Sequence, residues 1–308
     1  MLRIIFMGNP EFALPTIKSI QLSDHQLVGV VSNPSKRLGR GRKFKKTAVG
    51  SYAERENLNL IMPKHLNDNK FVSLIKNLRP DIFVIVAYKI LPDTIIQIPK
   101  YGAINLHASL LPKYRGAAPI QWAIMNGERR TGVTIFQIVS KVDAGDILLQ
   151  KEMEIQDDDN YFSLGTRLCE LGSRMIVKSL NGIYNNRINY SPQNPSLATL
   201  APKISKNMLL INWSWGAVKI HNWIRGLSPY PGMATRIKDK RLRIFKSKVV
   251  DKNYDFKPGT IINCTNYLLI ATGEGALLIL DLQIEGKKRM KAEMFLRGFN
   301  INEGQIIG

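Results

Sequence analysis

The chain has 308 residues, of which 44% are hydrophobic, and it carries 44 Lys and Arg against 24 Asp and Glu, a formal net charge of +20. This length and composition exclude an intrinsically disordered chain and predict a globular protein with room for two domains. The charge favours a polyanionic partner such as nucleic acid or an anionic membrane surface, although a genome biased toward Lys, Asn and Ile would produce the same excess.

The sequence predicts no signal peptide, no membrane helix, no disulfide and no metal site. The first apolar run, residues 2–7, is too short for a signal-peptide core, and no run approaches the roughly 18 apolar residues of a membrane helix. Cys169 and Cys264 lie far apart without a CxxC pair, so neither a disulfide framework nor a metal site is expected. We expect a cytoplasmic protein with no membrane partner and no metal.

Strands and helices alternate through the first part of the chain. Apolar runs typical of strands lie at residues 2–7, 26–32, 81–87, 101–108 and 132–138, with an extended arm at 147–155. Helical patterns begin at Pro15 and cover residues 67–77, 118–125 and 161–184. This alternation predicts an α/β fold with a doubly wound, mostly parallel sheet.

The turn after the first strand reads Gly8-Asn9-Pro10-Glu11. It lacks the G-x-G-x-x-G spacing that lets a pyrophosphate approach the backbone, and Glu11 would repel the phosphates. A dinucleotide site is therefore not predicted, although the turn can still border a pocket at the carboxyl ends of the strands.

The second half of the chain differs in composition. Residues 187–207 are rich in Asn, Ser, Gln and Pro and show little apolar periodicity, as linkers do. A helix is predicted at 213–227, followed by short apolar runs separated by Gly and Asn turns, the pattern of a small β-barrel. We predict domains at residues 1–188 and 208–308, joined by a linker over 189–207.

The segment 104–116, INLHASLLPKYRG, places an amide and an imidazole two residues apart just before a loop containing Pro and Gly. In a strand this spacing puts Asn105 and His107 on the same face. An amide donor beside an imidazole suits a reaction in which a carbonyl oxygen gains negative charge. A carboxylate that orients the imidazole would complete the site, and the spacing leaves Asp143 and Asp146 as equal candidates.

These motifs resemble the methionyl-tRNA formyltransferase family over nearly the whole chain. The resemblance rests on Asn105-x-His107, on the run from Ser109 through Gly116 with its continuation AAPIQ, and on the sequence DAGD at residues 143–146. It implies a Rossmann-like formyltransferase sheet with a C-terminal OB-like β-barrel. It also implies that Asp143, rather than Asp146, is catalytic together with Asn105 and His107.

The implied reaction moves a formyl group from 10-formyltetrahydrofolate, a co-substrate, to the α-amine of methionine on initiator tRNA. The resemblance places the folate along the loop after His107, at Ser109, Leu110, Leu111 and Pro112. The alternative for these apolar residues is ordinary turn packing, and the two interpretations are compatible.

Positive charge gathers in two regions. Between residues 35 and 46 no side chain is acidic, and the resemblance implies that this loop binds the tRNA acceptor arm through Arg37, Arg40, Arg42, Lys43, Lys45 and Lys46. Composition alone gives equal weight to a solvated surface. Residues 202–308 carry 18 basic and 8 acidic side chains, a net charge of +10, which suits binding to tRNA phosphates.

Two other kinds of protein remain as alternatives. One is a formylfolate-dependent transferase that acts on a sugar nucleotide or on glycinamide ribonucleotide, and the other is a nonenzymatic tRNA-binding protein. The basic loop and basic barrel together argue against the first, and the intact Asn105, His107 and Asp143 argue against the second. A monomer is expected, because no coiled coil is evident.

Overall fold

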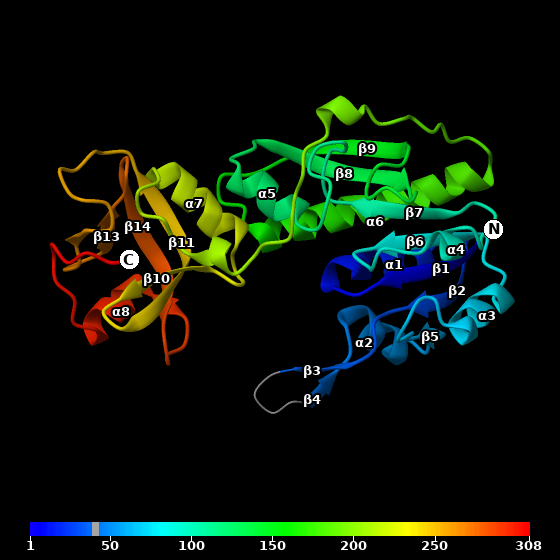
Figure 1. The fold of residues 1–308 in the computed structure, drawn as a ribbon, viewed down its shortest axis with the longest axis horizontal. Coiled ribbons are helices and arrows are strands. Elements are labelled where there is room, and N and C mark those ends of the chain that lie inside the picture. The colour runs from blue at the N-terminus through cyan, green and yellow to red at the C-terminus, as the bar shows by residue number, and fades with distance from the viewer. Residues whose placement is uncertain (39–42) are drawn as a thin grey trace. The chain divides into compact units, whose positions relative to one another are not determined.

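The computed structural model describes residues 1–38 and 43–308, which form two compact units (Figure 1). The first unit comprises residues 1–119, 131–154 and 165–201, and the second comprises residues 120–130, 155–164 and 202–308. The segment predicted as a linker is thereby divided, because its residues up to 201 contact the first unit and the remainder belongs to the second.

A seven-stranded sheet forms the centre of the first unit, in the order β5-β2-β1-β6-β7-β8-β9. The strands are β1 (Arg3–Gly8), β2 (Gln26–Val31), β5 (Leu60–Ile61), β6 (Ile82–Val86), β7 (Ala103–His107), β8 (Arg130–Gln137) and β9 (Ile147–Glu154). The strands from β5 to β7 are parallel, and β8 is antiparallel to β7. The order reverses direction at β1, which confirms the predicted doubly wound, mostly parallel sheet.

Helices connect these strands, and four of the six α-helices described between Leu14 and Tyr184 were predicted. The helical segments are η1 (Glu11–Ala13), α1 (Leu14–Gln21), α2 (Ala48–Arg55), α3 (Asn69–Asn77), α4 (Asp93–Ile96), α5 (Pro119–Met125), α6 (Tyr161–Tyr184) and η2 (Pro195–Leu197). The sequence analysis missed α2, whose central Gly50 weakens the helical pattern while Thr47 caps its first turn. It also missed α4, a single turn too short to show a period. None of the described helices is long and apolar enough to span a membrane.

Alternation along the strands builds the core on both faces of the sheet. Ile5 and Met7 of β1 pack with Phe83 and Ile85 of β6 in one apolar cluster, which α3 covers with its own buried side chains. The intervening residues of each strand are also buried, as expected for a parallel sheet covered on both sides.

Helix α6 lies close against β7, the strand that carries the predicted catalytic residues. A Cβ atom at Gly172 of α6 would overlap the side chain of Leu106, so only glycine permits this approach. Leu106 is buried, and its neighbours Asn105 and His107 point to the opposite face of the sheet. The contact between Gly172 and Leu106 therefore sets how closely α6 packs against β7, the strand that carries Asn105 and His107.

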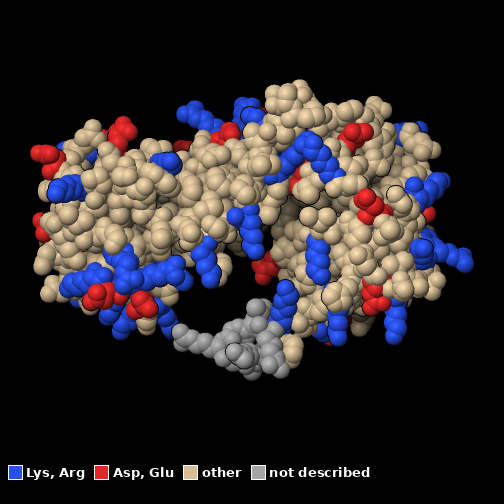
Figure 2. All heavy atoms as spheres, in the orientation of Figure 1, with Lys and Arg blue, Asp and Glu red and all other residues tan. Residues whose placement is uncertain are grey.

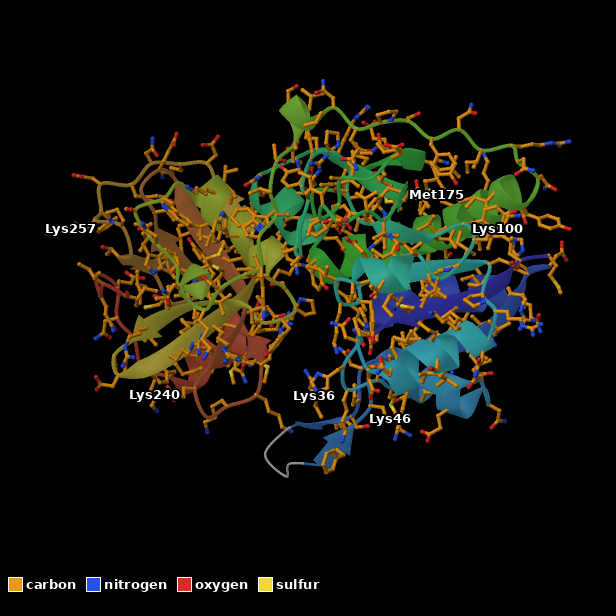
Figure 3. All side chains as sticks on the ribbon, turned by 45° about the vertical axis from the view of Figure 1, so that its right-hand side comes forward. Lys36, Lys46, Lys100, Met175, Lys240 and Lys257 are labelled. Atoms are coloured by element: carbon orange, nitrogen blue, oxygen red, sulfur yellow. The ribbon has the colours of Figure 1, made fainter. Side chains whose placement is uncertain are left out.

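Two short strands stand where the sequence analysis expected a basic loop. β3 (Lys36–Leu38) and β4 (Lys43–Lys45) pair in an antiparallel hairpin. The hairpin extends away from the sheet (Figure 1), and Lys36 and Lys46 mark its base (Figure 3). The segment was not predicted as strands because its residues are charged and do not alternate with apolar ones.

The second unit is an antiparallel sheet curled around a hydrophobic core, in the order β10-β11-β14-β13-β12 with β15 paired to β14. Its elements are η3 (Asn207–Leu209), α7 (Ala217–Gly226), β10 (Met233–Ile237), β11 (Lys240–Val250), β12 (Ile261–Asn263), β13 (Leu268–Ala271), β14 (Ala276–Ile284), β15 (Met290–Lys291) and α8 (Ala292–Gly298). The predicted OB-like barrel domain is confirmed in the form of a half-barrel, and η3, β10, β15 and α8 were not predicted.

Candidate active site

The predicted catalytic residues gather at the carboxyl edge of the first unit's sheet, where β7 ends at His107. Open parallel sheets bind their ligands at this edge. The backbone here is unusual, because Tyr114 and Asp143 both have positive φ angles, 61° and 49°, although neither is glycine. Such conformations cost free energy and concentrate at functional sites.

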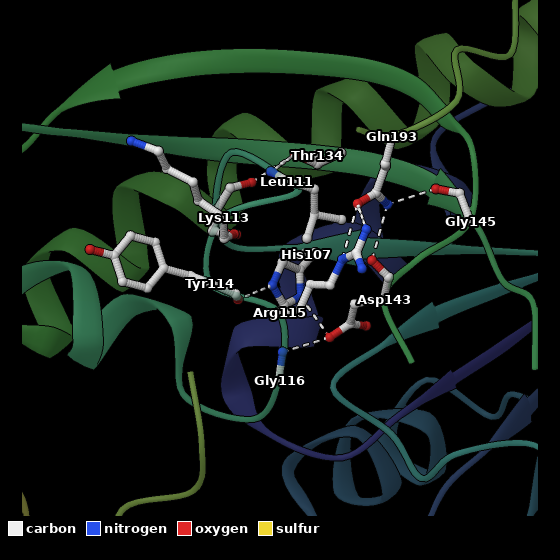
Figure 4. Close-up of polar contacts among 11 residues, drawn as sticks. His107, Leu111, Lys113, Tyr114, Arg115, Gly116, Thr134, Asp143, Gly145 and Gln193 are labelled. Carbon is white, nitrogen blue, oxygen red and sulfur yellow. Dashed lines mark hydrogen bonds and ion pairs between the residues drawn. The ribbon is translucent and has the colours of Figure 1, made fainter. Parts of the chain in front are cut away.

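His107 is almost fully buried, at 7% exposure, and its ring has a distinct environment at each nitrogen (Figure 4). The Nε2 atom lies 2.8 Å from the carbonyl oxygen of Tyr114. A carbonyl can only accept, so Nε2 carries a proton and donates it. The Nδ1 atom lies 3.8 Å from Oδ2 of Asp143, too far for a hydrogen bond but close enough for charge interaction. Nδ1 is therefore the nitrogen left for a substrate.

The structure places Asp143, one of the two carboxylates left open by spacing, beside the imidazole. Its Oδ2 accepts a hydrogen bond of 2.8 Å from the backbone N–H of Gly116. Two residues later, a Cβ atom on Gly145 would overlap the carbonyl group of Gln137 at the end of β8, so this loop lies tightly against the sheet. Both contacts hold the carboxylate in place.

Asn105 lies two residues before His107 on β7 and is half-buried. The strand alternation puts its side chain on the same face as the imidazole, as the sequence analysis predicted. Among the residues that the structure describes, no hydrogen bond is made by its side-chain amide. Its two N–H donors are thus available to an external oxygen.

The loop of Ser109, Leu110, Leu111 and Pro112 follows His107 directly, and Thr134 of β8 anchors it. The Thr134 hydroxyl donates to the Ser109 carbonyl at 2.7 Å and accepts from the Leu111 N–H at 3.1 Å. Gln150 of β9 donates to the Leu111 carbonyl at 2.8 Å. The Ser109 carbonyl and both backbone polar groups of Leu111 therefore already have partners within the chain.

Sequence reasoning missed the residues that support this site. Arg115 and Gln193 are both buried and bond to each other, while Thr134 and Gln150 fix the loop after His107. Gln193 lies in the segment that its composition assigned to a linker, and no motif marks it. Within residues 1–38 and 43–308, no cluster of three His, Cys, Asp or Glu side chains is placed to hold a metal ion.

The residues predicted to bind tRNA are only partly described. Arg40 and Arg42 lie outside the described residues, and Arg37 and Lys43 are placed on β3 and β4 by their backbone alone. Lys45 is exposed at the end of β4. The sixth predicted residue, Lys46, forms an ion pair with Glu54.

Basic side chains also line the outer face of the second unit. Figure 2 shows Lys and Arg gathered over the region of β10 and α8, with a few acidic groups among them. Along β11, Leu242 and Ile244 point inward while Lys240, Arg241 and Lys246 are exposed. A register shift after Ile244 changes which residues of the strand face outward, and Lys246 and Lys248 in its second half are exposed to solvent.

Known proteins are similar to this chain over nearly its whole length. The formyl transferase family matches residues 2–180, and the formyl transferase C-terminal domain matches residues 203–300. A methionyl-tRNA formyltransferase of Alkaliphilus oremlandii is 42% identical, with 100% of both chains covered. One of Thermodesulfovibrio yellowstonii is 44% identical over 98% of this chain and 97% of its own.

The chain belongs to the methionyl-tRNA formyltransferase family. Formyltransferases with other acceptors share the fold: WlaRD, a sugar 3N-formyl transferase solved in the presence of dTDP and 5-N-formyl-THF, superposes with a TM-score of 0.68. It is 21% identical over 94% of this chain and 99% of its own, so the likeness concerns the fold alone. The methionyl-tRNA formyltransferase resemblance is thus confirmed by full-length relatives, and the chain is an enzyme of that kind.

Proposed function

We propose that this enzyme transfers the formyl group of 10-formyltetrahydrofolate to the α-amine of methionine on initiator tRNA, using Asn105, His107 and Asp143. The observation that supports the proposal is the fixed orientation of the His107 imidazole. His107 is buried at a strand end, its Nε2 is engaged by Tyr114, and its Nδ1 remains free beside the Asp143 carboxylate. Family membership identifies the reaction that such a site serves.

In this reaction the neutral α-amine attacks the formyl carbon, a new C–N bond forms, and the bond to N10 of the folate breaks. Negative charge develops on the formyl oxygen during the attack. Asn105 can donate to that oxygen, and His107 can donate through Nδ1 when that atom is protonated. A single donor of this kind lowers the barrier by about 2.7 to 4 kcal/mol.

The proton released by the amine must reach N10 of the departing folate. His107 and Asp143 are the two groups at the site that can hold a proton, and their nearest atoms are 3.8 Å apart. The hydrogen bond from the Gly116 N–H holds the Asp143 carboxylate beside Nδ1 of His107. From this position the negative charge of Asp143 can orient the imidazole. We assign Asp143 to orientation and proton transfer, and His107 to both proton transfer and oxygen binding.

The folate is the co-substrate and supplies the formyl group. We place its ring beside Ser109, Leu110, Leu111 and Pro112, where apolar side chains and backbone groups meet. The carbonyls of Ser109 and Leu111 each accept one bond within the chain. A carbonyl oxygen has a second lone pair, so each can still accept from a heterocyclic N–H.

The tRNA partner is assigned by charge. Residues 202–308 carry a net charge of +10, and the segment 35–46 contains seven basic and no acidic residues. Phosphate neutralisation by Lys and Arg supplies most of the affinity for nucleic acids. We propose that Arg37, Arg40, Arg42, Lys43, Lys45 and Lys46 bind the tRNA. Initiator tRNA is used in the cytoplasm, where we expect the enzyme to act as a monomer.

The site assignment is tested by replacing His107 with alanine. Single-turnover formyl transfer should slow by about 100- to 1,000-fold, since one donor to the oxyanion and one proton carrier are lost. The dissociation constant for methionyl-tRNA should be unchanged, because His107 is almost fully buried and is not one of the basic side chains proposed to bind the tRNA. The matched control is His65→Ala at an exposed histidine, which should leave both quantities unchanged. A fully active His107→Ala enzyme would remove the imidazole from the mechanism.

A further inference from the structure

The segment 191–201 is bonded to both loops that form the site. Its Ser191 exchanges two backbone hydrogen bonds with Ile147, at 2.8 and 2.9 Å, just after the loop that carries Asp143. Further along, Thr199 and Ala201 bond the backbone of Arg115 on the loop after His107, at 2.9 and 2.7 Å. This segment therefore joins two loops that come from different strands.

Gln193 makes the link at the side-chain level (Figure 4). Its Oε1 accepts from Nε and Nη2 of Arg115, at 3.2 and 2.6 Å. Its Nε2 donates to the carbonyls of Asp143 and Gly145, at 3.0 and 2.7 Å. A carboxamide has two acceptor lone pairs and two N–H donors, and all four are used here. Turning the amide over would set donors against donors, so the orientation is fixed.

Both partners are withdrawn from solvent, with Gln193 at 9% and Arg115 at 8% exposure. Hydrogen bonds of this kind hold their groups firmly, because an unpaired buried donor or acceptor is costly. The segment also lies too close for any side chain at Gly116, where a Cβ atom would come within 2.7 Å of the Ala201 carbonyl. Gly116 is the residue whose N–H binds the Asp143 carboxylate.

We infer that Gln193 is a positioning residue for formyl transfer, which holds the backbone of Asp143 so that its carboxylate faces Nδ1 of His107. The inference rests on the proposed roles of those two residues. Asp143 has a φ of 49°, in the sparsely populated left-handed region, and Gln193 bonds the carbonyl of Asp143 itself and that of Gly145, two residues further along the same loop. Gln193 itself touches no reacting atom.

A positioning role predicts a loss of kcat without a loss of binding. Gln193→Met keeps the length of the side chain and removes all four hydrogen bonds. Gln193→Glu keeps the contact with Arg115 as an ion pair but sets carboxylate oxygens against the carbonyls of Asp143 and Gly145. We expect both variants to lower kcat by about 10- to 100-fold, with KM for methionyl-tRNA and for folate unchanged. If the Met variant does not fold because Arg115 is left unpaired, the Glu variant decides.

The second readout is a double-mutant cycle with Asp143→Asn, which removes the carboxylate that Gln193 positions. In that background Gln193→Met should no longer lower kcat, because two changes to one functional unit are not additive. The matched control is Gln26→Met, which breaks another Arg–Gln hydrogen bond, in which Nη1 of Arg3 donates to Oε1 of Gln26 at 2.8 Å. This pair lies at the amino ends of β1 and β2, opposite to the carboxyl ends where the site is found. That variant should leave kcat unchanged.

Two results would overturn the inference: an unchanged kcat in both Gln193 variants, or the same fold-loss with and without the Asp143 carboxylate. The second result would mean that Gln193 only stabilises the fold. A fully active Asp143→Asn enzyme would instead refute the proposed role of Asp143, and the inference with it. That failure is recognised separately, because it needs no change at Gln193.

Discussion

At the residue scale, the site depends on what each ring nitrogen of His107 contacts. The bond from Nε2 to the Tyr114 carbonyl fixes the tautomer and leaves Nδ1 facing both the substrate side and Asp143. Tyr114 adopts a φ of 61°, a conformation that bulky residues rarely take. The bonds from the Tyr114 N–H to Thr199 and from the Gly116 N–H to Asp143 hold the chain on either side of this carbonyl. The orientation of this one imidazole therefore depends on a strained backbone conformation at Tyr114.

Asn105 provides the test of oxygen binding at this scale. Asn105→Leu keeps a similar shape and removes the N–H donors, so kcat should fall by about 100- to 1,000-fold while KM for both substrates is unchanged. Steady-state kinetics with each substrate varied in turn measures both quantities. Asn59→Leu, an exposed asparagine that donates to the Val28 carbonyl, serves as the control. A larger KM at full kcat would show that Asn105 stabilises the bound substrate and the transition state equally and does not favour the developing oxyanion.

At the element scale, the sequence predicts those elements whose stability is local or strongly periodic. Helix α6 is found at its predicted bounds, and the apolar strands β1, β2 and β6 within a residue or two. The hairpin β3–β4 and the segment 191–201 were not predicted, because neither shows an apolar period. Gln193 is ordered by a partner 78 positions away, Arg115, and that contact leaves no mark on the local sequence. The same reasoning explains why Asn105 and His107 were found and their supports were not.

Helix α7 of the second unit carries a half-buried histidine, His221, that gives a pH dependence of stability. Burial, and to a lesser extent the positive charge of the nearby Arg225, lower the pKa of His221 from 6.5 to about 4. Its Nδ1 lies 3.0 Å from the Ser247 hydroxyl of β11. The unfolded chain takes up a proton below pH 6.5 and the folded chain does not until about pH 4. Stability is therefore lost as the pH falls between these values.

This loss should amount to about 2 kcal/mol at pH 5 relative to neutral pH. Urea unfolding of the native enzyme and of His221→Gln, each at about pH 7.5 and pH 5, measures the loss of stability that is due to His221. The other titrating groups are common to both proteins, whereas only the native enzyme carries this imidazole. The glutamine variant should lose less stability on acidification. An equal loss in both proteins would show that His221 is charged or solvated in the folded state.

At the scale of the whole molecule, chemistry and charge are distributed differently. The groups assigned to formyl transfer all lie in the first unit, on β7 and the loops that follow β7 and β8. Residues 202–308 carry a net charge of +10, half of the total of +20 on about a third of the chain, and the described part of the hairpin adds exposed lysines to the first unit. A small folate needs a shaped pocket, whereas a tRNA needs an extended basic surface. Two units with different surfaces suit an enzyme that joins one substrate of each kind.

An acceptor assay tests whether initiator methionyl-tRNA is the substrate that this enzyme formylates. The purified full-length chain is mixed with 10-formyltetrahydrofolate and, in separate reactions, with initiator methionyl-tRNA, elongator methionyl-tRNA or an amino-sugar nucleotide, and formylated product is measured over time. We expect rapid formylation of initiator methionyl-tRNA, much slower formylation of the elongator, and none of the sugar nucleotide. Formylation of the sugar nucleotide, or an enzyme that binds initiator methionyl-tRNA without formylating it, would refute the proposed function.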